Sequence, residues 1–220
     1  MSGPAGVRDQ LLSLGSATIG ESGGRPLPPR IKPAWPGARL AAPAYTVTCP
    51  PGDNLAIHLA VAEAPAGAAL VVDAHERPER GYWGEVLTTA AEARGLVGLV
   101  IDGGVRDISA VAAHGFPMFS ALVALPGATK LGGGAVGGVT RLAGVDVSPG
   151  DWVIGDADGV TVVGRAEVEV VLAAAWSRAD RETAMFDRLR QGSTTLELLE
   201  LDGRSVERPE PPAPPGGNDG

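Results

Sequence analysis

The sequence predicts a mixed α/β fold, and three features of its 220 residues lead to this prediction. Between residues 45 and 125, apolar and β-branched runs alternate with helical patterns, which is typical of parallel strands joined by helices. Residues 132–164 are rich in glycine and contain short β-type runs separated by turn residues, which predicts a compact β layer. A long helical pattern then covers residues 166–190 and ends at Gly192.

The individual elements are predicted in chain order from their periodicity and their stop signals. Residues 7–14 should form a short first helix that ends at Gly15, and residues 22–37, rich in glycine and proline, should be irregular. The later strands are rich in β-branched and apolar residues, whereas the helices carry apolar side chains at helical spacing. The strands are expected at residues 45–49, 69–74, 96–101 and 116–125, and the helices at residues 54–64, 85–94 and 107–115.

The composition favours an acidic protein without a nucleic-acid or anionic-membrane surface. The net charge is −8 and the lysines are Lys32 and Lys130 alone, whereas phosphate binding needs clustered positive charge. The single cysteine, Cys49, excludes an intrachain disulfide and a thiolate metal cluster, and its surroundings indicate an inert buried thiol. The sequence shows no signal-peptide pattern and no apolar run of about 18 residues, so a soluble cytoplasmic protein is expected.

The chain length favours one domain, which we expect to cover residues 1–206. Residues 207–220 should form a disordered tail with polyproline character, because five of the seven residues from Pro209 to Pro215 are proline.

The stretch Ile-Asp-Gly-Gly-Val-Arg-Asp at residues 101–107 is the main candidate for a functional site. It follows an apolar strand, and its two glycines predict a sharp turn before Arg106 and Asp107. A surface turn with a solvated ion pair is the alternative interpretation, and residue chemistry taken alone favours that alternative.

The helix that begins after Gly84 offers a second feature, because its first N–H groups lack intrahelical partners and lie at the positive end of the helix dipole. In a parallel sheet this helix end and the 101–107 stretch share one edge, where α/β proteins usually bind ligands. Arg106 could hold a carboxylate there through two parallel hydrogen bonds, and Asp107 with Glu85 could bind a divalent cation. The backbone N–H groups available to the same carboxylate are those of Glu85, Val86 and Leu87.

Five segments carry a resemblance to a known family. They are GDN at 52–54, GYWGEVLTTAAEARG at 81–95, GLVIDGGVRD at 98–107, GFP at 115–117 and SPGDWVIGDADGVTVV at 148–163. With these segments in order, the chain resembles the 4-hydroxy-4-methyl-2-oxoglutarate/4-carboxy-4-hydroxy-2-oxoadipate aldolases from about residue 11 to residue 201. That family of metal-dependent pyruvate aldolases also contains the regulator of ribonuclease activity A. The resemblance implies an α/β fold of the swivelling β/β/α kind, assembled as homotrimers or homohexamers with sites between subunits.

The resemblance also implies roles for individual residues. The arginine that matches Arg106 binds the pyruvyl carboxylate, and the aspartate that matches Asp107 anchors Mg²⁺ or Mn²⁺, largely through waters. An acidic residue that matches Glu85 shares the water shell of the metal, and Glu182 best matches a glutamate from the C-terminal helix of a neighbouring subunit. The regulator branch often lacks the aspartate after the arginine, so the intact Arg106–Asp107 pair favours catalysis. The substrate-binding candidates beside Arg106 are Gly84, Val86, Leu87 and Asn54.

Several candidates also have a structural interpretation. Glu85 suits the first turn of a helix, and Asn54 suits a helix N-cap. Glu182 falls within a helical stripe of apolar residues, where a charge needs a partner or solvent. The other members of that stripe are Leu172, Ala175, Ala179, Phe186 and Leu189.

The histidines and the remaining polar candidates are assigned by their neighbours. His58 lies one turn after Asn54, so it either enters the pocket or is a core or interface histidine. His75 is expected to be solvated and His114 to cap the end of its helix. Trp83 is expected to pack rather than to wall the pocket. Asp156 and Asp158 are expected to be β-turn acids.

The expected function is that of a metal-dependent lyase acting on a 4-hydroxy-2-oxo acid. The metal and Arg106 would hold the pyruvyl end, and a water ordered by Glu182 would take the proton of the 4-hydroxyl. The C3–C4 bond would then break to give pyruvate enolate, so decarboxylation of oxaloacetate is an expected side activity. Two alternatives remain open: a biosynthetic lyase with the same site, and a non-catalytic binding protein that resembles the ribonuclease regulator.

Overall fold

The structure is a computed structural model that describes residues 6–207. Contacts within the chain define two units, Met1–Ala179 and Asp180–Gly220. This division falls inside the long C-terminal helix, whereas the sequence predicts a single domain to residue 206, and that boundary stays a prediction. The expected tail of residues 207–220 lies outside the described residues except for Glu207.

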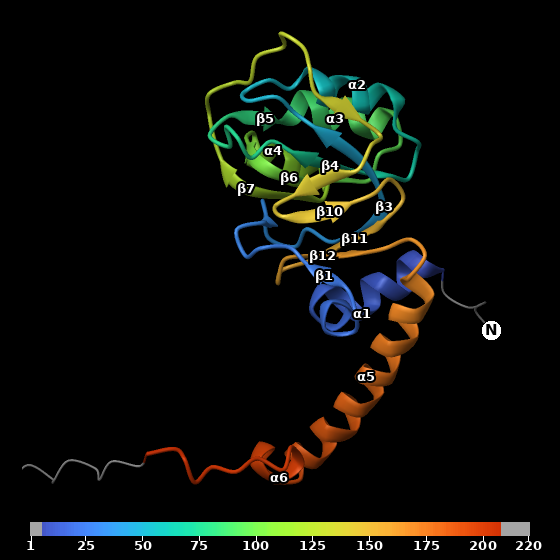
Figure 1. The fold of residues 1–220 in the computed structure, drawn as a ribbon, viewed down its shortest axis with the longest axis vertical. Helices are drawn as coiled ribbons and strands as arrows, with labels where there is room; N and C mark the ends of the chain where they lie inside the picture. Colours follow the sequence, from blue (N-terminus) through green and yellow to red (C-terminus); the bar gives the residue numbers. More distant parts are fainter. Residues whose placement is uncertain (1–5, 208–220) are drawn as a thin grey trace, which may run out of the picture. The chain divides into compact units, whose positions relative to one another are not determined.

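The described residues contain both predicted classes of element, drawn in Figure 1. The helices are α1 (Val7–Glu21), α2 (Leu55–Glu63), α3 (Glu85–Ala93), α4 (Ile108–His114), α5 (Val168–Arg190) and α6 (Thr195–Leu198). The first strands are β1 (Arg25–Pro26), β2 (Lys32–Pro33), β3 (Leu40–Thr48), β4 (Ala69–Asp73), β5 (Gly81–Trp83) and β6 (Gly98–Val105). The later strands are β7 (Met118–Val123), β8 (Ala135–Val136), β9 (Thr140–Leu142), β10 (Val145–Val147), β11 (Trp152–Gly155) and β12 (Val160–Val163).

A single strand, β3, joins the two parts of the main sheet. Its first half, from Leu40 to Pro43, pairs antiparallel with β11, and its second half, from Ala44 to Thr48, pairs parallel with β4. The parallel part continues through β4, β6 and β7, and the antiparallel part continues through β11, β12 and β1. The predicted parallel α/β part and the predicted β layer are therefore both present, and they share β3.

Helices cover the main sheet in the first unit (Figure 1). One hydrophobic cluster packs α2, α3 and α4 against one face of the parallel strands, and a second lies between the other face and the β9–β12 region. A third cluster packs α1 and the first turns of α5 on β3, β11 and β12. The central parallel strands β4 and β6 are buried on both faces, which explains why their sequences read as continuous apolar runs.

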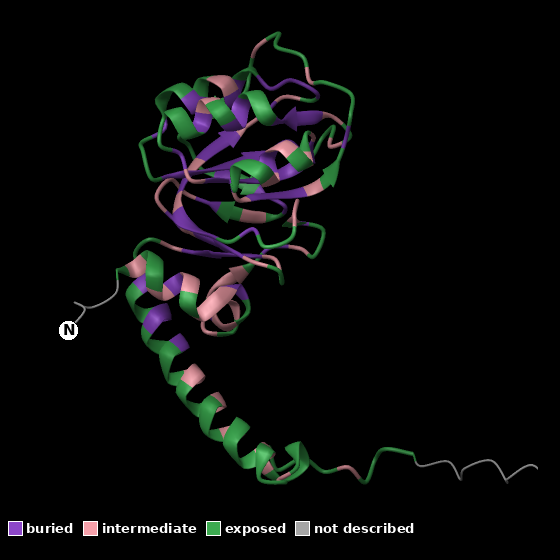
Figure 2. Cartoon of the chain, turned by 180° about the vertical axis from the view of Figure 1, so that it is seen from behind, coloured by how far each residue is buried: buried purple, intermediate pink, exposed green. Residues whose placement is uncertain are grey.

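The helix α5 changes character along its length, as Figure 2 shows. Its buried residues, from Val168 to Ala175, all lie in the first unit. From Ala179 onward none of the described side chains of α5 is fully buried, so the stripe predicted over the whole helix packs only in its first half.

Two sequence expectations need correction. The helix predicted at residues 7–14 does break at Gly15, where φ is 80° and ψ is 165°, but it resumes and ends at Glu21. The carboxylate of Asp156, 140 residues away, accepts hydrogen bonds from the backbone N–H of Ser16 at 2.7 Å and from its hydroxyl at 2.6 Å. The N-terminal cap of this second segment therefore comes from a turn that is distant in the sequence. The periodicity of the residues around Gly15 gives no signal for such a cap.

The second correction concerns the glycines of the 101–107 stretch. Gly103 and Gly104 lie inside β6, which continues to Val105, so they do not form a turn. A Cβ on Gly104 would lie 2.5 Å from the carbonyl oxygen of Arg80 and 2.7 Å from that of Pro78. The glycine is therefore needed because another backbone segment approaches closely at an irregular point of the β6–β7 pairing.

Candidate active site

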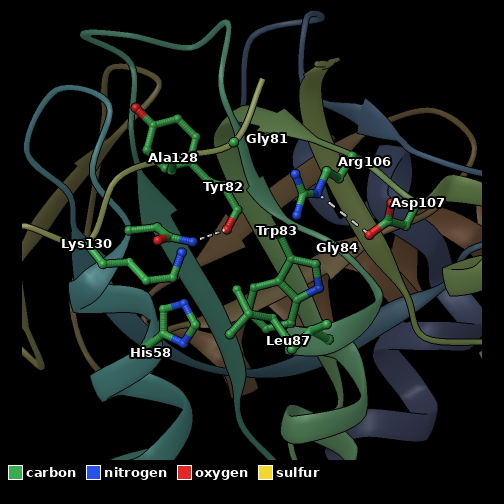
Figure 3. Close-up of a pocket in the computed structure, with 13 residues that line it drawn as sticks. His58, Gly81, Tyr82, Trp83, Gly84, Leu87, Arg106, Asp107, Ala128 and Lys130 are labelled. Carbon is green, nitrogen blue, oxygen red and sulfur yellow. Dashed lines mark hydrogen bonds and ion pairs between the residues drawn. The ribbon is translucent and has the colours of Figure 1, made fainter. Parts of the chain in front are cut away.

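A cavity of about 240 Å³ lies where β6 ends and where α2 and α3 begin (Figure 3). This is the edge of the parallel strands where α/β proteins bind ligands. The segment Gly127–Lys130 forms another part of its wall. Its lining residues are Asn54, His58, Gly81, Tyr82, Trp83, Gly84, Val86, Leu87, Arg106, Asp107, Gly127, Ala128 and Lys130.

Arg106 and Asp107 both line the cavity. The backbone N–H of Arg106 donates to the carbonyl of Trp83 at 2.9 Å, which extends the β6 edge. Asp107 then adopts a left-handed conformation with φ of 56°, which is uncommon for a residue other than glycine. The two side chains are 43% and 41% exposed, and Arg106 Nε lies 3.8 Å from Asp107 Oδ2. This contact is too long for a bidentate pair, so the guanidinium fork remains available to a ligand.

The carboxylate of Asp107 sits at the N-terminus of α3. Asp107 occupies the N-cap position of α4, but its side chain makes no capping hydrogen bond there. Its Oδ2 accepts instead from the backbone N–H of Glu85 at 3.1 Å. A Cβ on Gly84 would lie 2.3 Å from this oxygen, so glycine at position 84 makes the approach possible.

The next two N–H groups of α3 belong to Val86 and Leu87, and both residues line the cavity. Neither N–H donates to an acceptor among residues 6–207. Because they lie in the first turn of a helix, they form a ready site for a carboxylate or another anion. The structure therefore brings the Arg106 side chain and the predicted N–H groups into one cavity.

Asn54 is buried in the wall of the cavity, with 5% of its surface exposed. Its Nδ2 donates to the carbonyl of Tyr82 at 2.8 Å, whereas its Oδ1 has no hydrogen-bond partner among the described residues. Asn54 does occupy the N-cap position of α2, as the alternative interpretation has it, but its side chain makes no capping hydrogen bond, and Asp53 Oδ1 accepts from the Leu55 N–H at 2.9 Å instead.

His58 and Lys130 line the cavity on the side away from Arg106 and Asp107 (Figure 3). The ring of His58 is partly buried, and its Nε2 is buried without a hydrogen-bond partner in the described part of the chain. Burial lowers the pKa of His58 below its ordinary value, and the nearby Lys130 charge lowers it further. Sequence analysis missed Lys130 as a site residue, since it lies in a loop without a recognisable motif.

Two predicted residues do not line the cavity with their side chains. Glu85 is 55% exposed, and its Oε1 lies 3.8 Å from His114 Nε2. Glu182 lies on α5 in the second unit, is partly buried, and is not among the lining residues. The role predicted for Glu182 involves a neighbouring copy and stays a prediction.

The carboxylates suit a cation held mainly by water. No cluster of three or more His, Cys, Asp or Glu side chains placed to hold a metal occurs in residues 6–207. Asp107 offers an exposed hard oxygen beside the cavity, and Glu85 is the adjacent acid along α3. One carboxylate with a water shell matches the preference of Mg²⁺ for retaining several waters.

The other polar residues have structural partners. His75 Nδ1 lies 2.5 Å from Asp73 Oδ1, so His75 is paired rather than simply solvated. His114 Nδ1 contacts Glu92 Oε2 at 2.7 Å, and no capping bond from its side chain is seen in the described residues.

The remaining predictions can also be compared with the structure. Cys49 is buried, and burial raises the pKa of its thiol to about 12, as expected for an inert cysteine. Asp156 accepts from the N–H of Asp158 at 3.1 Å, which confirms the turn assignment. Trp83 both packs against Phe116 and lines the cavity. No helix among residues 6–207 has the length and apolar character needed to cross a membrane.

Fold and cavity together define an α/β protein with a small polar site at the carboxyl edge of its parallel strands. Residues 7–162 match the RraA-like family, described as Aldolase/RraA, and the chain belongs to this family. The resemblance inferred from the sequence and the predicted α/β fold are thereby confirmed.

Known relatives include differently named proteins. A protein of Halalkalibacterium halodurans named "Putative 4-hydroxy-4-methyl-2-oxoglutarate aldolase" is 37% identical over 173 residues, 77% of this chain and 82% of that protein. The structure of an uncharacterized protein from Pseudomonas syringae pv. tomato has a TM-score of 0.76 at 27% identity, covering 91% of this chain and all of that one. The RNA-processing inhibitor RraA from Thermus thermophilis has a TM-score of 0.61 at 25% identity, covering 67% and 91%.

Proposed function

We propose that this protein is a divalent-metal-dependent lyase that cleaves a 4-hydroxy-2-oxo acid into pyruvate and a second 2-oxo acid. One observation carries the proposal: the Arg106 fork, the unpaired N–H groups of Val86 and Leu87 and the Asp107 carboxylate share one cavity. The donors suit the carboxylate of a 2-oxo acid, and the adjacent carboxylate suits a cation beside the keto oxygen. The names of relatives support an aldolase of this kind.

The residues of this chain would act in sequence. Arg106 binds the pyruvyl carboxylate in a fixed plane, and the N–H groups of Val86 and Leu87 bind the same end. Asp107 with Glu85 would hold Mg²⁺ or Mn²⁺, which when bound supplies positive charge that stabilises the enolate oxygen. Loss of the 4-hydroxyl proton then breaks the C3–C4 bond and leaves pyruvate enolate in the cavity. The same arrangement should decarboxylate oxaloacetate, because that reaction forms the same enolate.

The far side of the cavity favours an acid with a second carboxylate. Lys130 lies on the side of the cavity away from Arg106 (Figure 3). A substrate such as 4-hydroxy-4-methyl-2-oxoglutarate or 4-carboxy-4-hydroxy-2-oxoadipate carries a carboxylate at its far end, and the Lys130 ammonium would pair with it.

Assembly forms part of the same proposal. Glu182 belongs to the second unit, and we assign it to the site of a neighbouring copy in a homotrimer or homohexamer, where it orders a water. The resemblance noted in the sequence supports this assignment, since it matches Glu182 to a glutamate from the C-terminal helix of a neighbouring subunit.

The test is release of pyruvate from a panel of 4-hydroxy-2-oxo acids and from oxaloacetate, with Mg²⁺ or Mn²⁺ and with EDTA. Turnover should require the metal and should be abolished in the Asp107→Asn variant, which keeps the size of the side chain. A matched control is Asp158→Asn, an exposed acid outside this cavity, which should retain wild-type rates.

A non-catalytic binding protein is the second candidate, favoured by the structural likeness to the RNA-processing inhibitor RraA. Under this alternative no 2-oxo acid is turned over with any divalent metal, and oxalate, which mimics pyruvate enolate, neither binds nor inhibits. That combined result would overturn the lyase proposal.

A further inference from the structure

The proposed cleavage requires a group that accepts the proton of the C4 hydroxyl, and His58 has the required properties. Its imidazole lines the cavity, and its buried Nε2 has no hydrogen-bond partner in the described part of the chain. A buried polar atom without a partner is energetically unfavourable, so such an atom is usually satisfied by water or by a ligand. Burial lowers the pKa of the ring and so favours its neutral form, in which one ring nitrogen carries a lone pair.

Asn54 strengthens this assignment from the preceding turn of α2. Its Nδ2 is bound to the Tyr82 carbonyl, which fixes the orientation of the amide and leaves Oδ1 as an acceptor without a donor. The neighbouring Asp53 shows that polar groups here are otherwise satisfied, because its carboxylate accepts from Leu55 N, Thr129 Oγ1 and Leu131 N. Like His58 Nε2, this oxygen is a buried polar atom that a ligand in the cavity would satisfy.

The other polar groups of the cavity are poor proton acceptors. Arg106 and Lys130 are cations, and the Asp107 carboxylate is bound to the Glu85 N–H and faces Arg106. The Tyr82 hydroxyl donates to the Arg77 carbonyl and accepts from the Gly52 N–H, and burial raises its pKa. Among the described lining residues, a neutral nitrogen base is therefore present at His58.

The position of His58 fits the reacting carbon. Arg106 and Asp107 hold the pyruvyl end on one side of the cavity, and His58 lies on the other side, beside Lys130 (Figure 3). A substrate bound by its 2-oxo acid end therefore extends its C4 group toward His58. Because Nε2 has almost no contact with solvent here, the side chains around it must shift as the substrate binds.

We infer that His58 is the catalytic base that removes the proton from the C4 hydroxyl; this inference rests on the proposed lyase function. The O–H bond breaks and its proton goes to Nε2, while the oxygen electron pair forms the C4 carbonyl. The C3–C4 electron pair becomes the C2–C3 double bond of pyruvate enolate. A water then protonates C3, and the resulting hydroxide takes the proton from His58, so that no proton is gained or lost overall.

This assignment changes one step of the sequence-based mechanism. In the mechanism predicted from the sequence, a water ordered by Glu182 takes the hydroxyl proton, whereas here that water protonates C3. The roles of His58 and Glu182 can then be tested separately by the choice of substrate. Oxaloacetate has no C4 hydroxyl, so its decarboxylation needs C3 protonation but not the step assigned to His58.

The experiment compares kcat/KM for cleavage of a 4-hydroxy-2-oxo acid with kcat/KM for oxaloacetate decarboxylation, in wild type and in His58→Gln. Cleavage should fall by about 10²-fold or more, and decarboxylation by a much smaller factor. His75→Gln, a histidine change outside this cavity, is the matched control and should leave the ratio unchanged. The smaller variant His58→Ala should regain cleavage when imidazole is added, and the melting temperature of each variant reports its folding.

The outcomes distinguish this inference from the proposed function. Selective loss of cleavage with rescue by imidazole supports His58 as the base. Equal loss of both reactions without rescue, in a variant that remains folded, overturns the inference while the lyase proposal stands. A wild-type protein that turns over neither substrate overturns both.

Discussion

The carboxylate of Asp107 accepts a hydrogen bond from the backbone N–H of Glu85 at 3.1 Å, 22 residues earlier in the chain. This bond places the carboxylate at the N-terminus of α3, where the helix dipole favours negative charge. It also holds Asp107 beside the unpaired N–H groups of Val86 and Leu87. The Asp107 carboxylate is therefore held by a helix end, which leaves the guanidinium fork of Arg106 available for the carboxylate of the proposed substrate.

Arg106→Lys should keep the charge and the fold but lose the planar fork that orients a carboxylate. The kcat/KM for a pyruvyl substrate should fall by roughly 10²-fold, on the order of 3 kcal/mol of transition-state stabilisation. Oxalate should also inhibit the variant far less than the wild type. Arg94→Lys, outside the cavity, serves as the control. Wild-type kinetics in Arg106→Lys would exclude a bidentate role.

Gly84→Ala should impair the site more than the fold. The added Cβ would lie 2.3 Å from Asp107 Oδ2, and this oxygen ends a side chain that can rotate away. We expect at least about tenfold lower kcat/KM and a higher Mg²⁺ requirement, with a small change in melting temperature. Gly138→Ala, where a Cβ has no atom within 4 Å, is the matched control. An unaltered Mg²⁺ requirement would show that Asp107 needs no fixed position.

Glu182→Gln tests the shared site. If Glu182 works in the site of a neighbouring copy, the variant should lower kcat more than it changes the melting temperature, and it should affect both reactions alike. Mixing inactive Asp107→Asn with inactive Glu182→Gln protein should restore part of the activity through hybrid sites. Absence of complementation, when subunit exchange has been shown, would contradict the shared site.

The His75–Asp73 pair should make stability depend on pH. The hydrogen bond to Asp73 raises the pKa of His75 above its ordinary value, so the folded state binds the proton more tightly than the unfolded state does. The pair therefore contributes fully below about pH 6.5, the value for an unperturbed histidine, and its contribution is lost as the pH rises through the folded pKa. His75→Asn should remove this part of the pH dependence in urea unfolding measured from pH 5 to 9. An unchanged pH profile would show that the His75–Asp73 pair does not contribute to the free energy of unfolding.

Some of the site follows from residues that are close in the chain. Arg106 and Asp107 are adjacent, and the carboxyl edge of a parallel sheet is predictable from alternating strands and helices. The first turn of α3 was also predictable, since its N–H groups lack intrahelical partners by geometry alone. These features depend on local periodicity and on neighbouring residues, so the sequence determined them, and it also placed the chain in its family.

Only the tertiary structure decided which distant groups meet. The Asp107 carboxylate accepts from the N–H of Glu85 and does not cap α4. The loop at Gly127–Lys130 brings the Lys130 ammonium to the cavity. The Asp156 carboxylate, 140 residues from Ser16, caps the second half of α1. The glycines of the 101–107 stretch were mistaken for a turn because a close backbone approach leaves no local pattern. Hydrogen bonds and close approaches of this kind depend on where the whole chain has packed, and hydrophobic periodicity carries no information about polar partners so far apart in the sequence.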